Sequence, residues 1–134
     1  MFCMTYSTVV IVTVRNGKVV IAGSAEQLCL PFIFAELSKK SLSENAVDIV
    51  RLVTNVEAYD PHTGLGWLII NKFKGVSQFT FSDEACELWI YDIYYVLLPE
   101  AIKLTDGYKW FELDELVDFR EVEKSIVAEV LLLQ

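Results

Sequence analysis

Leu30-Pro31-Phe32-Ile33-Phe34-Ala35-Glu36 opens the most informative segment of this sequence. The segment continues, after a polar stretch, as Asn45-Ala46-Val47-Asp48-Ile49-Val50-Arg51-Leu52-Val53-Thr54-Asn55-Val56-Glu57-Ala58. Its pattern predicts a short strand, a loop and one helix. Ser41 and Glu44 have capping-box spacing at the helix start, with Ser43 as the alternative cap. Asn55 fits the helix end, because Asn tolerates the left-handed conformation that closes many helices.

The predicted helix is apolar over an unusually wide part of its surface. At about 100° per residue, its apolar side chains cover an arc of roughly 220°, about twice what a helix on a single core needs. These side chains are Ala46, Val47, Ile49, Val50, Leu52, Val53 and Val56. Something besides one core must therefore cover the helix: either the adjoining cleft collapses onto it, or a second subunit docks there. Of these two possibilities, we favour collapse of the cleft onto Ile49, Leu52 and Val53.

This layout resembles the Nudix hydrolase family. The family's signature has a Leu-Pro-Gly-Gly loop, a nearby Glu, and a helix that carries Arg-Glu, a hydrophobic residue, a Glu-Glu pair and a closing Gly. The matching residues here, with about one extra loop residue at 38–41, are Leu30, Pro31, Glu36 and Asn55. The replacements are Phe32 and Ile33 for the two glycines, Asp48 for the Arg, and Ile49, Leu52 and Val53 for the three glutamates.

The resemblance implies a Nudix fold whose metal site has been lost. In Nudix hydrolysis, helix glutamates hold divalent cations through oxygen, and water attacks a diphosphate. Ile49, Leu52 and Val53 offer no oxygen, so we expect no metal cofactor and no catalytic residue. Family glycines let the backbone approach phosphates closely. Phe32 and Ile33 should instead fill the volume that a substrate diphosphate would occupy.

The remaining sequence fits a single Nudix-like α/β domain over residues 1–134, with a mixed sheet between helices. Strands are predicted at 6–14, 19–22, 27–31, 67–73, 76–81 and 88–98. Asn16-Gly17 predicts a tight hairpin between the first two. Residues 109–116 resemble the Trp-Phe-x-x-x-Glu-Leu segment of many Nudix chains. A closing helix at about 120–133 follows, with its apolar stripe formed by Val122, Ile126, Val130 and Leu133.

The strand at 88–98 is apolar on both sides, which is typical of a strand covered on two faces. One side carries Trp89, Tyr91, Ile93, Tyr95 and Leu97. Its aromatic residues fit core or interface packing, and stacking on a nucleobase is the alternative.

Composition narrows the function classes. The chain has 134 residues, 54% of them hydrophobic and 22% charged, which is typical of one globular domain. A net charge of −8 argues against binding nucleic acid. No apolar run approaches the length of a membrane span, and we find no signal peptide.

Cys3, Cys29 and Cys86 lack CxxC spacing, so we expect free thiols and a cytoplasmic location. His62, the single histidine, is expected in a solvated loop.

Three functions remain open. The first is a non-catalytic protein-interaction domain, most simply a homodimer or other homo-oligomer. The second is a binding module for a nucleotide-like ligand. The third is a divergent hydrolase of a nucleoside-diphosphate-linked substrate, with substitute Mg²⁺ ligands drawn from Glu36, Asp48, Glu57, Glu84 and Glu87. We favour a non-catalytic role.

Overall fold

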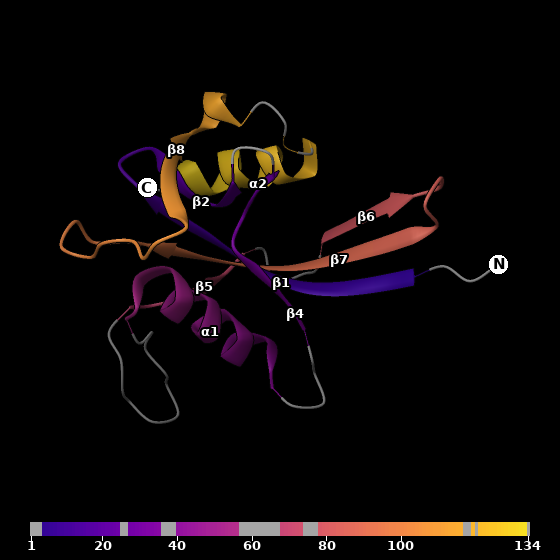
Figure 1. Ribbon diagram of the computed structural model, residues 1–134, viewed down its shortest axis with the longest axis horizontal. Helices are drawn as coiled ribbons and strands as arrows, with labels where there is room; N and C mark the ends of the chain where they lie inside the picture. Colours follow the sequence, from indigo (N-terminus) through magenta and orange to yellow (C-terminus); the bar gives the residue numbers. More distant parts are fainter. Residues whose placement is uncertain are drawn as a thin grey trace.

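The structure, a computed structural model, describes residues 4–24, 27–35, 40–56, 68–73, 78–116, 119 and 121–133. Within these residues, one mixed sheet of eight strands lies between two α-helices, as predicted (Figure 1). The strands are β1 (Met4–Arg15), β2 (Lys18–Ser24), β3 (Gln27–Cys29), β4 (Phe32–Phe34), β5 (Asn71–Lys72), β6 (Gln78–Ser82), β7 (Glu87–Leu97) and β8 (Tyr108–Glu112). The helices are α1 (Leu42–Thr54), the short 3-10 helix η1 (Leu113–Glu115) and α2 (Glu121–Leu131).

A parallel pair of long strands, β1 and β7, forms the centre of the sheet. Their register runs from Met4 opposite Glu87 to Val14 opposite Leu97. Every other pairing among the described strands is antiparallel: β2 and β4 with β1, β3 and β8 with β2, and β5 and β6 with β7. The β1–β2 turn is the predicted hairpin, with positive φ at Asn16 (51°) and Gly17 (77°).

Successive side chains of the central strands point to opposite faces of the sheet, so a hydrophobic core forms on each face. The α2-side core includes Val10, Val12, Val14, Tyr91, Ile93, Ile126, Val127 and Val130. The α1-side core includes Val9, Ile11, Val20, Ala46, Ile49, Val50, Val53, Tyr94 and Val96. Figure 1 shows the two helices on opposite faces, so both sides of β1 and β7 are covered. This explains why the 88–98 segment is apolar on both sides.

Helix α1 is fixed at both ends as its sequence predicted. The Ser41 side chain accepts a hydrogen bond from the Glu44 backbone N–H (3.2 Å), and the Glu44 carboxylate accepts one from the Ser41 N–H (3.3 Å). Asn55 closes the helix in the left-handed conformation (φ 57°). Thr105 adds a tertiary cap, because its N–H donates to the carbonyl oxygen of Val53 (2.8 Å) and its hydroxyl to that of Leu52 (2.6 Å).

Helix α2 is shorter than the predicted 120–133. Ile126, Val127 and Val130 are buried as expected. Leu133 is 52% exposed, so placing it on the buried stripe was wrong. The physical reason is that the helix ends at Leu131, so Leu133 lies beyond its last residue.

The cysteines differ from the prediction. Cys29 is a free thiol, but Cys86 is disulfide-bonded, so the expectation of free thiols throughout was wrong. Spacing along the sequence gave no sign of this bond. The parallel pairing of β1 and β7 brings Cys86 beside the start of β1, where the Met4 N–H donates to the Cys86 carbonyl oxygen (3.0 Å).

No helix in the described part of the chain is long and apolar enough to cross a membrane.

Candidate functional site

The α1 residues that the resemblance aligns with the metal-binding glutamates of the Nudix family lie in two different environments. Ile49 and Val53 are 1% and 0% exposed and belong to the α1-side core, which confirms that this part of the face is covered. Leu52 is 59% exposed, so the favoured prediction, collapse of the cleft onto all three residues, was wrong at Leu52. Cover of Leu52 by a second subunit stays a prediction. On a helix, Leu52 points about 100° away from Val53, and the sheet does not extend around to it.

The segment Phe32–Phe34 is a strand where the family has a glycine loop. Because β4 pairs antiparallel with β1, with Val9 opposite Ile33 and Val10 opposite Phe32, successive side chains point to opposite faces. Ile33 packs against the α1-side core. Phe32 faces the α2 side and is 41% exposed. Whether these side chains exclude a diphosphate stays a prediction.

The substitute carboxylate ligands are not assembled in the described part of the chain. Asp48 forms ion pairs with Lys40 and with Arg51 (3.2 Å). Glu87 accepts a hydrogen bond from the indole N–H of Trp89 (3.1 Å). Glu36, Glu57 and His62 lie outside the described residues. Among the residues that are described, no group of three or more His, Cys, Asp or Glu side chains could hold a metal ion.

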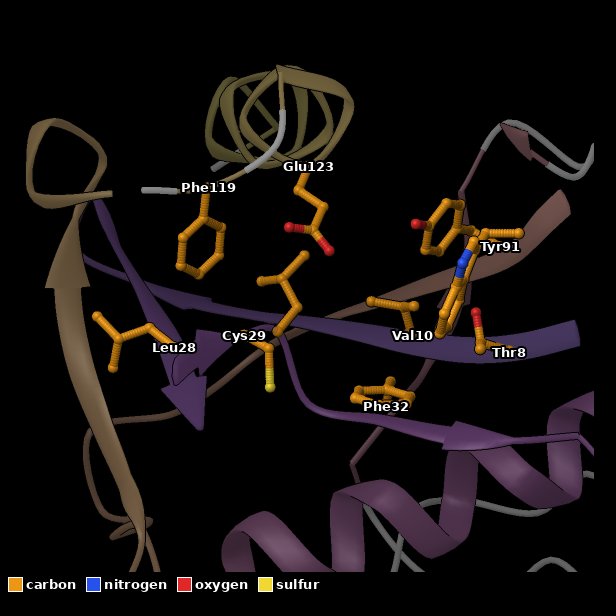
Figure 2. A pocket seen from close by; sticks show the side chains of 10 residues that line it. Thr8, Val10, Leu28, Cys29, Phe32, Tyr91, Phe119 and Glu123 are labelled. Carbon is orange, nitrogen blue, oxygen red and sulfur yellow. The ribbon is translucent and has the colours of Figure 1, made fainter. Parts of the chain in front are cut away.

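A cavity of about 320 Å³ opens on the other face of the sheet, between the strands and α2 (Figure 2). Its lining residues are Thr8, Val10, Leu28, Cys29, Leu30, Phe32, Trp89, Tyr91, Phe119 and Glu123. Glu123 is the one charged residue among them, and Figure 2 shows its carboxylate pointing from α2 toward the strands. The sequence pattern put Trp89 and Tyr91 on one side of a strand, but gave no sign that they border a cavity.

Aromatic rings continue from the cavity along the exposed end of the sheet. Tyr6 stacks on Trp89 with ring centroids 4.6 Å apart, and Phe32 meets Phe34 edge-on at 5.5 Å. Phe34 also lies 6.1 Å from Trp89. These four residues, which we call the aromatic cluster, come from three strands. Two of them, Phe32 and Trp89, also line the cavity, so the cluster adjoins it.

The environment around Cys29 is poorly solvated and negative. Burial raises the pKa of the Cys29 thiol above its ordinary value, and the negative charge of Glu123 raises it further. Figure 2 shows the sulfur pointing away from α2. A thiol with a raised pKa stays protonated at neutral pH and is a weak nucleophile. Cys29 therefore lines the cavity as a thiol of lowered reactivity.

Compared by sequence, the chain matches no protein-family model and no curated protein. Its backbone resembles solved Nudix structures over nearly its whole length. The E. coli dihydroneopterin triphosphate pyrophosphohydrolase superposes with a TM-score of 0.68 at 10% identity, covering 96% of each chain. The C. elegans Ap4A hydrolase gives 0.63 at 13% identity, covering 98% of this chain and all (100%) of that one.

A third similar structure contains a ligand. The NUDIX domain of Shewanella oneidensis NrtR, solved in complex with ADP ribose, gives a TM-score of 0.59 at 14% identity, with 97% of this chain and 87% of that chain covered. Identities this low establish the fold alone. The chain therefore has a Nudix-like α/β fold, as its sequence predicted.

Val53 is buried and Leu52 is exposed, so the same substitution at the two positions should affect stability differently. Val53→Glu places a carboxylate in the α1-side core without a partner, so we expect it to lower the free energy of unfolding by about 3 kcal/mol or more. Leu52→Glu makes the same kind of change on the exposed side and should stay within about 0.5 kcal/mol of the unmodified chain. Urea denaturation measures both. Equal stability of the two variants would contradict the placement of Val53.

The surroundings of Cys29 predict how the reactivity of its thiol depends on pH. The rate of Cys29 alkylation by iodoacetamide, followed by peptide mass spectrometry, should rise with a midpoint pH above that of a free cysteine measured alongside. Glu123→Gln should lower the midpoint, and Glu129→Gln on the same helix should leave it unchanged. Because the pKa is raised in the folded state, ionisation of Cys29 also removes stability as the pH rises through that pKa. A midpoint at or below that of free cysteine would rule out this description.

Proposed function

We propose that this chain is a non-catalytic Nudix-fold domain that binds a small ligand in the cavity between α2 and the sheet. The observation that carries the proposal is the burial of Ile49 and Val53 in the α1-side core. A metal at these positions would require oxygen ligands where the core now has packed methyl groups. Each such side chain contributes about 1.5–3 kcal/mol when fully buried, so the fold depends on these residues remaining apolar.

The size and lining of the cavity support the proposed binding of a small ligand. Its volume of about 320 Å³ lies at the small end of the range typical of ligand pockets. Such pockets are mostly apolar, with a few polar groups that orient the ligand. Here Thr8, Tyr91 and Glu123 supply polar groups within an aromatic and aliphatic wall. A Nudix domain that holds ADP ribose shows that this fold accommodates nucleotide-like ligands.

A protein contact is the second candidate, and it is favoured by exposed apolar side chains. Phe34 (50% exposed) and Phe81 (54%) are large hydrophobic residues left open on strands. Such side chains, when they cluster, mark interaction surfaces. A homo-oligomer would cover them, and light scattering after gel filtration measures the oligomeric state.

A cytoplasmic location remains part of the proposal. The disulfide at Cys86 counts against it, because stable disulfides are rare in reducing compartments.

The direct test of the non-catalytic role is a hydrolysis assay. With Mg²⁺ or Mn²⁺ present, we expect no release of product from ADP ribose or diadenosine tetraphosphate above the rate without protein, because the helix positions offer no metal ligands. Metal-dependent turnover that disappears in Glu36→Gln or Glu57→Gln would establish the divergent hydrolase instead. A known Nudix hydrolase in the same buffer serves as the positive control.

A further inference from the structure

The sheet continues past the part that the two helices cover. In β1 the residues at 8–14 are buried, whereas residues 4–5 are exposed and residues 6–7 are half-buried. The paired end of β7, Glu87–Ile90, is half-buried as well. Figure 1 shows this end of β1 and β7 reaching beyond both α1 and α2. Within the described part of the chain, apolar side chains at this end are therefore not covered by a helix.

Five side chains at this end form one apolar patch on the α2 side of the sheet. They are Met4 and the aromatic cluster (Tyr6, Phe32, Phe34 and Trp89), and we call them the cluster patch. Alternation along β1 puts Met4 on the same face as Tyr6, which pairs with Trp89. The ring centroid of Phe34 lies 6.2 Å from that of Tyr6 and 6.1 Å from that of Trp89. Met4 is 55% exposed, Phe34 50% and Phe32 41%, so the patch is open to a partner.

The area of the cluster patch matches what a stable dimer needs at the centre of its interface. A large side chain of this kind has about 150–250 Å² of surface when it is free. With three members about half exposed and the other two partly exposed, the patch offers on the order of 400 Å² of largely apolar surface. A standard interface buries about 800 Å² on each partner, and somewhat more than half of that area is apolar. The patch therefore supplies most of the apolar area of one side of such an interface.

The charge distribution points to a second copy of the chain as the partner. The net charge is −8, so two copies repel each other unless they meet through surfaces of low charge. None of the five side chains in the cluster patch is charged, and the neighbouring Glu87 accepts a hydrogen bond from the indole N–H of Trp89. A basic partner would be attracted to acidic surface instead of this patch. A two-fold contact presents the same surface from both partners, which suits an uncharged apolar patch.

We propose that two copies of this chain stack their cluster patches face to face across a two-fold axis and so form a homodimer. This inference rests on the second candidate under the proposed function, a protein contact, and names its surface and its partner. Sheets that pack face to face interdigitate their side chains at a spacing of about 10 Å. Aromatic pairs across the axis add to the stabilisation that comes from buried area. Because Phe32 and Trp89 also line the cavity, the second copy lies beside it.

The experiment is sedimentation velocity on the full chain over a series of concentrations. We expect the unmodified chain to sediment with twice the mass of one chain and to dissociate on dilution. Phe34→Glu and Met4→Glu should each raise the dissociation constant of the dimer at least about tenfold, because each places two unpaired carboxylates in the apolar contact. Leu132→Glu changes an exposed apolar residue beyond the end of α2 and should leave the dissociation constant unchanged.

A mixing experiment tests the two-fold arrangement itself. Phe34→Lys should be monomeric, like Phe34→Glu, because each variant brings like charges together across the axis. An equimolar mixture of the two variants should recover the dimer mass, since opposite charges then face each other within one small patch. Thermal melting checks that each variant is folded, and the mass of the unmodified chain tests the inference even where a variant is not.

Three results would overturn the inference. They are a monomeric unmodified chain, a dimer that both Phe34→Glu and Met4→Glu leave intact, and folded Phe34→Glu and Phe34→Lys variants whose mixture stays monomeric. Failure of the proposed function is seen separately, because metal-dependent hydrolysis and ligand binding in the cavity are measured in other assays and do not alter the sedimenting mass of the chain.

Discussion

The parallel ladder between β1 and β7 is the interaction on which the rest of this structure depends. A parallel pair buries both of its faces, so the strands must be apolar on each side and each face must be covered. Residues 8–14 of β1 are all buried, and they alternate between the two cores. Helix α1 covers one face and α2 the other (Figure 1). Each helix therefore needs an apolar side that faces the sheet.

The two faces have different consequences for function. On the α1 face, Ile49 and Val53 complete a hydrophobic core. The resemblance aligns them with metal ligands of the Nudix family, and under the proposed function no metal binds there. On the α2 face, the helix leaves part of the sheet uncovered, and Trp89, Tyr91 and Phe32 border a cavity. Because α1 and the cavity lie on opposite faces of the sheet, the proposed non-catalytic role of the α1 face is compatible with ligand binding in the cavity.

Local sequence signals predicted the elements well. The capping box at Ser41 and Glu44, the left-handed Asn55 and the Asn16-Gly17 hairpin each depend on a few neighbouring residues, and each is present. The overall fold also followed from the resemblance to Nudix chains. The exposure of Leu52 was missed because helical periodicity gives the width of an apolar arc but not where the sheet ends beside it. The disulfide at Cys86 and the cavity at Glu123 were missed because they depend on segments that meet only in the folded chain.

Under the proposed function, positions 49, 52 and 53 of α1 hold no metal ion. Paramagnetic broadening by Mn²⁺ tests it most directly, because bound Mn²⁺ broadens the NMR signals of nearby amides. We predict that stoichiometric Mn²⁺ leaves the amide signals of Ile49, Leu52 and Val53 unbroadened, with only weak, non-saturating effects near exposed carboxylates. Saturable broadening centred on these three residues would contradict the account.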